Sequence, residues 1–380
     1  MFNPRANVTM LDPRYAVRDS SELLSPSLLV YPQIVRRNIE EMIKIAGGGV
    51  RLRPHVKTHK MAEIVRLEES LGVRKHKCAT IAEAEMAAAA GATDVLLAYP
   101  LTGPNLKRFA QLVRAYRTTT FRATVDHPDS ARALSAAAQG LPSPVPVLVD
   151  LDIGMGRTGI QPGEAAAELY SLVNELPNLA VDGLHAYDGH IHETDLAKRR
   201  QIAQAGVEGA LALRDRLLKQ GLPVPHFVVG GTPTFPIHAE LDFPGVECSP
   251  GTPVLHDHSY LTRFPDLPFT PAALLLTRVV SHPGPGRVCL DLGHKAVAAD
   301  PAGPRAKMLE LDDARQVVHS EEHMVIETAR ADSLPIGTPL FAIPTHICPT
   351  VALHRRAYII DDGRLVGQWE VTARDRVLGI

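Results

Sequence analysis

A lysine placed directly after a short apolar run is the residue of this chain best suited to covalent chemistry. Lys57 lies in the segment RPHVKTHK (residues 53–60), which follows the run GVRL (residues 49–52) that we interpret as a short buried strand. A lysine just past a strand end can point into a pocket, where loss of water lowers its pKa and makes its amine a nucleophile. A lysine of this kind can hold the aldehyde of pyridoxal phosphate as a Schiff base. The alternative interpretation is a basic surface turn.

Two turns rich in small residues are suited to binding a phosphate group. A strand runs into Gly230, Gly231 and Thr232, and a second turn contains Gly251 and Thr252. Exposed backbone N–H groups in such turns can hold a dianion, and barrel proteins often bind phosphate from their late strands. A glycine pair also occurs in ordinary tight turns, so this pattern is weak on its own.

Two further segments place reactive side chains after strands. Arg157 lies in the glycine loop GMGRTG (residues 154–159), where its guanidinium could pair with a phenolate or carboxylate. The segment LHAYDGHIH (residues 184–192) contains Tyr187, His190 and His192, and one of these could be a base. The alternatives are a glycine loop with a solvated arginine and histidines with a structural role.

A histidine and a cysteine two residues apart indicate a metal site. His346 and Cys348 lie in the segment PTHICPT (residues 344–350), and on an extended chain both side chains point to the same side. Imidazole with thiolate suits zinc. Two ligands do not complete a site, so we expect substrate or water to supply the remaining ones.

The elements that position these residues alternate regularly between strand and helix from residue 27 to residue 262. The expected strands are 27–30, 49–52, a strand ending at 78–80, 95–98, 123–126, 145–152, 184–187 and 227–230. The expected helices are 34–45, 61–71, 81–90, 103–116, 130–138, 165–176 and 197–219. This alternation predicts parallel strands with crossover helices, and so many units favour a (β/α)8 barrel.

The barrel interpretation places the candidate residues where barrel chemistry occurs. The carboxyl ends of barrel strands carry the active site. The residues expected at these ends are Lys57, Thr80, Asp126, Asp152, Tyr187 and Gly230.

A second, β-rich domain is expected over residues 263–380. Alternating apolar segments at 273–280, 287–290, 316–318, 339–343 and 357–360 are separated by turn signals such as PGPG (residues 283–286). This domain carries the metal pair, and residues 1–26 are expected to pack on it.

Composition excludes several classes of function. The chain has 380 residues, 45% of them hydrophobic, and a net charge of −2, which is typical of a soluble globular protein that does not bind nucleic acid. No apolar run is long enough for a membrane span, and the N-terminal residues do not form a signal peptide. Four cysteines without C-x-x-C spacing fit a reducing, cytoplasmic setting.

These motifs, taken in order, resemble the D-threonine aldolase and D-serine dehydratase family over nearly the whole chain. The matching segments are RPHVKTHK, TIAEA (80–84), DIGMGRTG (152–159), LHAYDGH (184–190), GGT (230–232), PGRVCLDLG (285–293), PTHICPT and Trp369–Glu370. The resemblance implies a pyridoxal-phosphate enzyme with an alanine-racemase-like barrel and a C-terminal β domain, in which Lys57 carries the cofactor. The residues expected to bind the cofactor are Lys57, His55, Thr80, Arg157, Tyr187, Gly230, Gly231, Thr232, Gly251 and Thr252.

The resemblance also implies that His346 and Cys348 hold a divalent metal. A His-x-Cys pair is similar to the zinc site of the dehydratases, whereas aldolase-type members have His-x-Asp with manganese or a similar ion. We therefore favour zinc, with manganese or magnesium as alternatives. The catalytic histidine of the aldolases corresponds to His190 or His192, and the sequence does not decide between them.

The implied activity is a metal-assisted lyase reaction on a D-3-hydroxy amino acid. The aldolase version produces glycine and an aldehyde, and the dehydratase version produces ammonia and a 2-oxo acid. We place the aldolase first, because the AYDG segment (residues 186–189) and the overall layout are more similar to that branch. An amino-acid racemase and a cofactor-carrier protein are further alternatives, and the family resemblance implies a homodimer.

Overall fold

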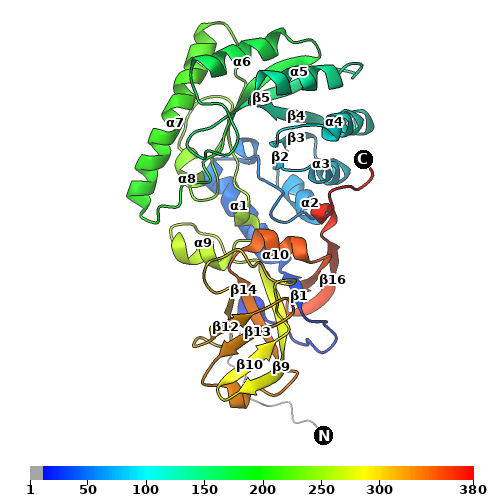
Figure 1. Cartoon of the computed structure of the whole chain (residues 1–380), viewed down its shortest axis with the longest axis vertical. Coiled ribbons are helices and arrows are strands. Elements are labelled where there is room, and N and C mark those ends of the chain that lie inside the picture. The colour runs from blue at the N-terminus through cyan, green and yellow to red at the C-terminus, as the bar shows by residue number, and fades with distance from the viewer. Residues whose placement is uncertain (1–11) are drawn as a thin grey trace. The chain divides into compact units, whose positions relative to one another are not determined.

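The structure, a computed structural model, describes residues 12–380 and divides into two compact units (Figure 1). One unit comprises Ile39–Pro253 together with the C-terminal residues Asp375–Ile380. The other comprises the described residues up to Asn38 together with Val254–Arg374. The predicted strand–helix alternation falls in the first unit, and the predicted β-rich region falls in the second.

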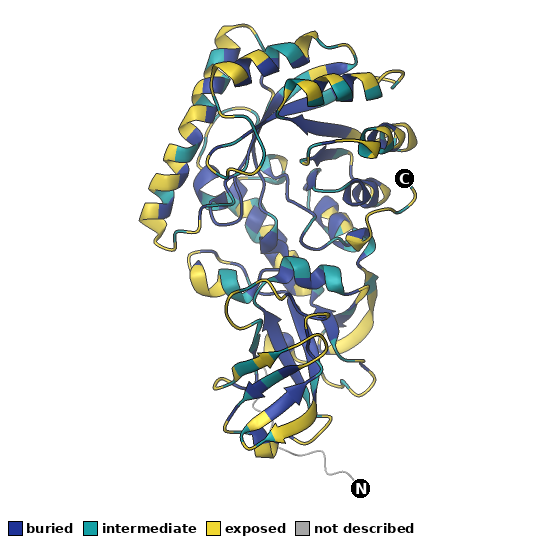
Figure 2. Ribbon diagram, viewed as in Figure 1, coloured by how far each residue is buried: buried dark blue, intermediate teal, exposed yellow. Residues whose placement is uncertain are grey.

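A seven-stranded parallel sheet forms the core of the first unit. Its strands follow one another in chain order, each paired in parallel with the next. The strands are β2 (Lys75–Cys78), β3 (Asp94–Leu97), β4 (Thr120–Val125), β5 (Val145–Leu151), β6 (Leu179–Ala186), β7 (His226–Val229) and β8 (Val246–Cys248). Most of their residues are buried (Figure 2), as expected for strands covered on both faces.

Residues 52–56 join the two edges of this sheet. The Arg53 N–H donates to Cys248 O at 2.9 Å, while the Lys77 N–H donates to Pro54 O at 2.8 Å and the Val56 N–H donates to Lys77 O at 2.9 Å. This extended segment therefore lies between β8 and β2 as an eighth strand. The predicted (β/α)8 barrel is confirmed.

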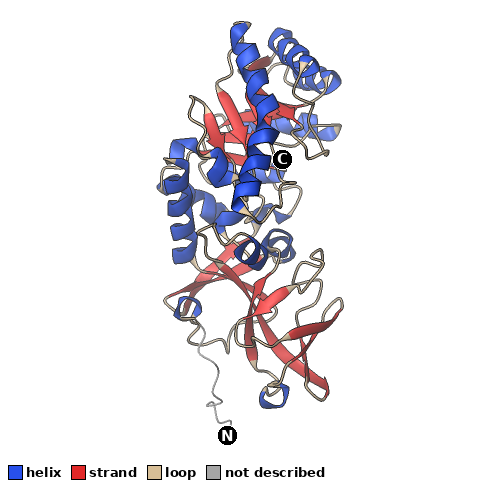
Figure 3. Ribbon diagram, turned by 90° about the vertical axis from the view of Figure 1, so that its left-hand side faces the viewer, coloured by secondary structure: helices blue, strands red, loops and turns tan. Residues whose placement is uncertain are grey.

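Helices cover the outside of this barrel (Figure 3). They are α2 (Ala62–Ser70), α3 (Ile81–Ala89), α4 (Pro104–Ala115), α5 (Pro128–Ala137), α6 (Glu164–Glu175), α7 (Leu196–Lys219) and the single turn α8 (Phe235–His238). Helix α1 (Pro32–Ala46) precedes them and spans the boundary between the two units. On α7, buried residues such as Val207 and Leu213 recur at helical spacing, so one face packs inward and the other stays exposed.

The second unit is built on a nine-stranded sheet. Its main path runs β12-β13-β10-β9-β1-β15-β16, with β11 paired to β14 and β14 paired to β9. The strands are β1 (Ser27–Val30), β9 (Ala273–Gly284), β10 (Arg287–Leu290), β11 (Ala306–Met308), β12 (Arg315–His319), β13 (Met324–Glu327), β14 (Pro339–Pro344), β15 (Arg356–Asp361) and β16 (Arg364–Glu370). Two short helices, α9 (His258–Arg263) and α10 (Ile347–Leu353), complete it.

Two predicted strands are wrong in type or in place. Residues Gly49–Arg51 form a 3-10 turn in place of the predicted strand, and a Cβ atom on Gly49 would lie 2.6 Å from Gly72 O, so this position requires glycine. Strand β1 (Ser27–Val30) does not belong to the barrel: it pairs antiparallel with β9 and parallel with β15.

The boundaries of the two units consequently differ from the predicted 27–262 and 263–380. The last six residues belong to the barrel unit, where the Gly379 N–H donates to Glu85 Oε1 at 3.0 Å. Of the N-terminal segment, residues 1–11 lie outside the described part. Residues 12–26 join the β unit, as Tyr15 Oη donates to Pro271 O at 2.8 Å.

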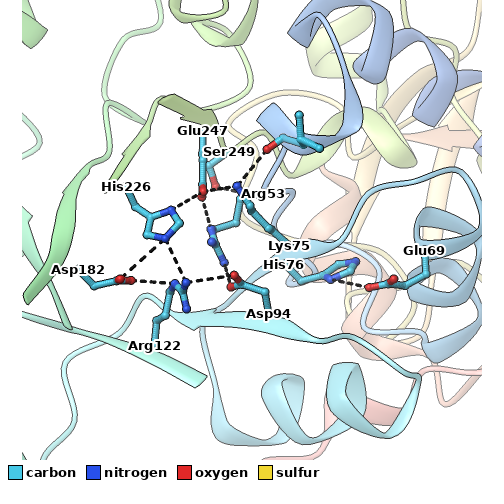
Figure 4. A network of polar contacts seen from close by, with 11 residues as sticks. Arg53, Glu69, Lys75, His76, Asp94, Arg122, Asp182, His226, Glu247 and Ser249 are labelled. Carbon is cyan, nitrogen blue, oxygen red and sulfur yellow. Dashed lines mark hydrogen bonds and ion pairs between the residues drawn. The ribbon is translucent and has the colours of Figure 1, made fainter. Parts of the chain in front are cut away.

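A layer of buried charges fills the barrel at the amino-terminal ends of its strands (Figure 4). Arg53, which is fully buried, donates through Nε to Glu247 Oε2 at 2.5 Å and through Nη1 to Asp94 Oδ1 at 2.6 Å. Glu247 also contacts Lys75 Nζ at 2.6 Å and His226 Nδ1 at 2.7 Å. Lys75, Asp94 and His226 are the first residues of β2, β3 and β7.

The protonation of Glu247 is tied to this layer. Burial alone would raise the pKa of Glu247, but Arg53 beside it and the hydrogen bonds from His226 and Arg53 hold that pKa well below its usual value. A carboxyl whose pKa is lowered by folding stabilises the fold above its unfolded pKa, and this contribution is lost as the pH falls towards the native pKa.

The structure predicts that Glu247→Gln destabilises the protein strongly. Because the substitution leaves Arg53 buried without its full charge partner, the free energy of unfolding at neutral pH should fall by about 3–5 kcal/mol. Glu240→Gln is the matched control, since Glu240 forms an exposed ion pair with Arg200 and should cost less than about 1 kcal/mol. Urea denaturation at neutral and acidic pH measures both. Two results would contradict a stabilising role of the charged layer. One is an equal loss of unfolding free energy in both variants, and the other is a Glu247→Gln protein whose unfolding free energy falls with acid as much as that of the wild type.

Candidate active site

Three cationic side chains surround the ring of Tyr187 at the carboxyl ends of the barrel strands. Lys57 Nζ and Lys77 Nζ each lie 5.6 Å from the ring centroid, and Arg157 Cζ lies 5.0 Å from it. Tyr187 follows β6 and Arg157 lies in the loop after β5. Lys57 follows residues 52–56, which we call the closing segment because they pair with both β8 and β2. The structure thus brings three predicted residues together and adds Lys77, which sequence reasoning missed.

His55 holds the backbone at Lys57. Its Nδ1 atom accepts the Lys57 N–H at 3.2 Å, and its side chain is buried. Burial lowers the pKa of His55 well below its usual value, and the neighbouring Lys57 and Lys77 lower it further. A neutral His55 is therefore available as an acceptor, and the excess of positive charge around it suits an anionic ligand.

Lys77 begins a buried polar chain that crosses the barrel. Its Nζ lies 3.4 Å from His185 Nε2, and His185 Nδ1 lies 2.6 Å from Asp150 Oδ1. Thr158 Oγ1 donates to the other Asp150 oxygen at 3.0 Å. Burial lowers the pKa of Lys77 to about 7, with Lys57 as the next cause. Burial also lowers the pKa of His185, against the effect of Asp150.

The two predicted phosphate turns meet at Thr232. Its Oγ1 accepts the N–H groups of Gly251 at 3.4 Å and Thr252 at 3.3 Å. A Cβ atom on Gly251 would lie 3.2 Å from His55 Cβ and 3.4 Å from Thr58 Oγ1. The turns therefore lie beside the residue that follows Lys57. Glycine backbone beside the segment that carries Lys57, together with the cations around Tyr187, fits the phosphate and the aldehyde of pyridoxal phosphate.

A buried carboxylate supports the first of these turns. Asp188 accepts from Thr234 Oγ1 at 2.8 Å and pairs with His238 Nε2 at 2.7 Å, and Thr234 Oγ1 in turn accepts the Gly231 N–H at 3.2 Å. Gly230 has φ +84°, a conformation that favours glycine. Sequence reasoning missed His238, because its spacing from the turn is only meaningful once α8 is known.

Other predicted residues shape the loops of the site. Asp152 Oδ1 accepts the N–H groups of Gly154 and Gly156, both at 3.0 Å, and these bonds lower the pKa of Asp152. Asp126 Oδ2 accepts the Gly159 N–H at 3.0 Å. The two carboxylates therefore fix both ends of the loop that carries Arg157.

Thr80 acts as a helix cap. Its Oγ1 accepts the Glu83 N–H at 3.0 Å at the start of α3, and Glu83 Oε2 accepts the Ala79 N–H at 2.7 Å. The pair is similar to a capping box, except that Glu83 accepts the N–H of the residue before the N-cap. A cofactor contact for Thr80 stays a prediction.

The two candidate bases lie in different environments. His190 packs on the glycine loop, where a Cβ atom on Gly154 would lie 2.8 Å from His190 Nε2. Its Nδ1 atom is buried and makes no hydrogen bond within the described residues 12–380. His192 is exposed.

The candidate metal pair lies in the second unit, in a local structure that differs from the predicted one. His346 is the N-cap of α10 and Cys348 lies in its first turn, so the two residues do not share one face of an extended segment. Their side chains are nevertheless hydrogen-bonded to one another. The predicted extended segment is wrong, and a role of the pair as metal ligands stays a prediction.

The surroundings of His346 suit a metal ligand. Its Nδ1 atom contacts Asp300 Oδ2 at 2.5 Å, which leaves Nε2 for a metal, and metal-bound histidines commonly pair with a carboxylate in this way. Burial alone would lower the pKa of His346, but Cys348 and Asp300 raise it to about 9. No group of three or more His, Cys, Asp or Glu among residues 12–380 is arranged to hold a metal, so the pair would need further ligands.

Comparisons with known proteins show which family the chain resembles. Residues 31–252 match the family model of the alanine racemase N-terminal domain, and residues 272–360 match that of the serine dehydratase domain. The 3-hydroxy-D-aspartate aldolase of Paracoccus denitrificans (strain Pd 1222) is 30% identical over 94% of each chain.

Solved structures show the same relationship. The D-threonine aldolase of Filomicrobium marinum has a TM-score of 0.84 and 27% identity, over 92% of this chain and 96% of that one. A cysteine-to-alanine mutant of D-threo-3-hydroxyaspartate dehydratase in the metal-free form has a TM-score of 0.80 and 25% identity, over 92% of this chain and 97% of that one.

None of the helices within residues 12–380 has the length and hydrophobicity of a membrane span.

The geometry of the two turns predicts a stability cost for Thr232→Val. The substitution removes the acceptor of the Gly251 N–H, and leaving such a group unpaired should lower the free energy of unfolding by about 1–2 kcal/mol. Thr232→Ser keeps the hydroxyl and should remain within about 0.5 kcal/mol of the wild type. Thermal or urea denaturation of the cofactor-free protein measures both. If the valine and serine variants unfold alike, the bridge between the turns does not contribute.

Proposed function

The chain belongs to the alanine-racemase-like family of D-threonine aldolases and D-serine dehydratases, and from this membership we propose that it is a pyridoxal-phosphate-dependent lyase of D-3-hydroxy amino acids. The observation that carries the proposal is the position of Lys57, which lies at a cation-rich barrel mouth beside two joined glycine turns.

Each part of pyridoxal phosphate has a matching partner in this site. Lys57 would bind the aldehyde, and the backbone of residues 230–232 and 251–252 would bind the phosphate. Arg157 and Tyr187 would orient the ring. When bound, the cofactor accepts the electron pair that is released at the substrate Cα atom.

His346 and Cys348 would hold a divalent ion, for which zinc is our first choice because of the imidazole and thiolate donors. A bound ion lowers the pKa of a coordinated hydroxyl. The metal-free cysteine mutant among the solved relatives supports a role for a cysteine. Asp300 would orient His346 through its Nδ1 contact.

In the aldolase reaction, a histidine takes the proton of the substrate β-hydroxyl at a ring nitrogen. His190 is the better candidate, since its buried Nδ1 makes no hydrogen bond to any described residue, whereas His192 is exposed. Cleavage between Cα and Cβ then yields glycine and an aldehyde. The 30% identity to a 3-hydroxy-D-aspartate aldolase supports placing this reaction first.

Dehydration is the second candidate reaction, and Cys348 is the observation that favours it. The Lys57 amine would take the α-proton, and loss of the β-hydroxyl would lead to ammonia and a 2-oxo acid.

We further expect a homodimer in a reducing compartment. The four free cysteines support the second expectation, because three of them are buried.

The aldolase assignment predicts which products form. Purified protein with pyridoxal phosphate and zinc or manganese should release glycine and an aldehyde from D-threonine or 3-hydroxy-D-aspartate. Lys57→Ala should lose activity by roughly 1,000-fold or more, because both reactions need this amine. Lys60→Ala is the control with a nearby lysine and should retain activity. Production of a 2-oxo acid without glycine would reverse the order of the two reactions.

The metal assignment predicts that Cys348→Ala lowers bound metal and activity together. Loss of one of two protein ligands should weaken metal affinity by roughly 100-fold or more, as measured by elemental analysis after dialysis. Cys348→Asp should regain binding with a preference for manganese over zinc. Cys289→Ala, which changes a buried cysteine of β10, is the control. Unchanged metal content in Cys348→Ala would remove this residue from the site.

A further inference from the structure

A second lysine of the barrel is buried without an anionic partner. Lys77 is only 2% exposed, and no carboxylate lies within ion-pairing distance of its Nζ in the part of the chain that the structure describes. Its hydrogen-bond partner there is His185 Nε2 at 3.4 Å. Buried lysines are rare unless they are paired, and an unpaired one loses its proton more readily because burial disfavours the charged form.

The lysine two residues earlier provides a comparison on the same strand. Lys75 also reaches the barrel interior, but its Nζ contacts Glu247 Oε1 at 2.6 Å within the buried ionic layer. Lys75 is therefore a paired, structural cation, whereas Lys77 lies at the opposite end of β2, towards Lys57. The difference between the two is in their partners, since both belong to one strand.

Lys77 and Lys57 face the same ring. Their Nζ atoms each lie 5.6 Å from the Tyr187 ring centroid, and the charge on either lysine acts on His55. The ionisable groups that surround Lys77 come from the closing segment, from strands β5 and β6, and from the loops that follow these strands. They are Arg53, His55, Lys57, Asp150, Arg157, His185, Tyr187 and Asp188.

We propose that Lys77 is the proton acceptor that converts the Lys57 ammonium group into the neutral amine. This inference rests on the proposed function, in which Lys57 binds pyridoxal phosphate. One proton moves from Lys57 Nζ to Lys77 Nζ. The Lys57 lone pair then adds to the aldehyde carbon. The new carbon–nitrogen double bond forms with loss of one water, which carries the aldehyde oxygen and the two remaining amine protons.

The polar chain behind Lys77 suits this role. His185 Nδ1–H donates to Asp150 Oδ1, so Nε2 is left as an acceptor for an N–H of Lys77. Because Lys77 donates towards the imidazole, its lone pair is directed away from His185 and can take up a proton. Asp150 favours the protonated form of Lys77 through its negative charge. His185 thus holds the Lys77 amine in place, and Asp150 stabilises the proton on Lys77 after the transfer.

The burial of Lys77 gives it the proton affinity that the transfer needs. Burial, followed by the charge of Lys57, lowers the pKa of Lys77 to about 7. A proton acceptor works best when its pKa lies close to the operating pH. An amine with the ordinary lysine pKa would be protonated near neutrality and could not accept.

The test is the pH dependence of the rate at which cofactor-free protein takes up pyridoxal phosphate. The rate is measured from the growth of the visible absorption band of the lysine-bound cofactor. The wild-type rate should rise through an apparent pKa near 7. In Lys77→Met the rise near pH 7 should be lost, so uptake near neutral pH should be at least about 10-fold slower. Lys77→Arg should be as slow as Lys77→Met near neutral pH, because a guanidinium does not accept a proton. Lys75→Met should show the wild-type profile.

A second variant, at Asp150, should shift the pH profile to lower pH. Asp150→Asn removes the charge that favours protonated Lys77, so the rise should move to lower pH. This variant decides the matter if Lys77→Met does not fold. An unchanged profile in Lys77→Met, full recovery in Lys77→Arg, or no acidic shift in Asp150→Asn would overturn the inference. A wild-type protein that shows no cofactor band at any pH would instead contradict the proposed function.

Discussion

The backbone hydrogen bonds of residues 52–56 are the constraint on which the site depends. They fasten this short segment between β8 and β2, with the Arg53 N–H on Cys248 O and the Val56 N–H on Lys77 O. The chain leaves the barrel directly after this point, so the direction of the Lys57 side chain is set by two neighbouring strands. The same bonds bring the Gly251 turn beside His55 and Thr58, and they place Lys77 so that its Nζ, like that of Lys57, lies 5.6 Å from the Tyr187 ring centroid.

Two charged layers lie inside the barrel, one strand repeat of two residues apart, so that Lys75 and Lys77 share a face of β2 but belong to different layers. Arg53 and Lys75 point into the lower layer, where Glu247 and Asp94 neutralise them at 2.5–2.6 Å. Lys77 points into the upper layer, where cations exceed anions. Neutralised charges stabilise the barrel, whereas unbalanced positive charge at its mouth attracts a phosphate and a substrate carboxylate. Residues two positions apart on one strand therefore have different roles: Lys75 stabilises the barrel, and Lys77 contributes to the binding site.

Much of the barrel could be predicted from the sequence, because apolar strands and helices with a regular period report directly on burial. The positions of residues after strands could be predicted for the same reason, as with Lys57, Tyr187 and Gly230. Strand β1 was assigned to the barrel because four apolar residues do not reveal which sheet they join. At Gly49–Arg51, which form a 3-10 turn, the backbone packs closely on that of Gly72, and a short apolar run does not reveal such a contact.

The missed residues are those whose meaning depends on partners across the barrel. Lys77 had a local signal, since KHKC places two lysines on one face of a strand. Its lack of an anionic partner, however, only emerges from the positions of His185 and Asp150. The pair His346 and Cys348 was found from residue types alone, although the start of α10 and not an extended chain brings them together.

Borohydride reduction of the cofactor-loaded protein, followed by peptide mapping, tests the central claim most directly. The reduction converts the bond between lysine and pyridoxal phosphate into a stable adduct that mass spectrometry can place. The account predicts one adduct, on the peptide that contains Lys57 and at that residue. An adduct on Lys60 or Lys77, or none on any lysine, would contradict it.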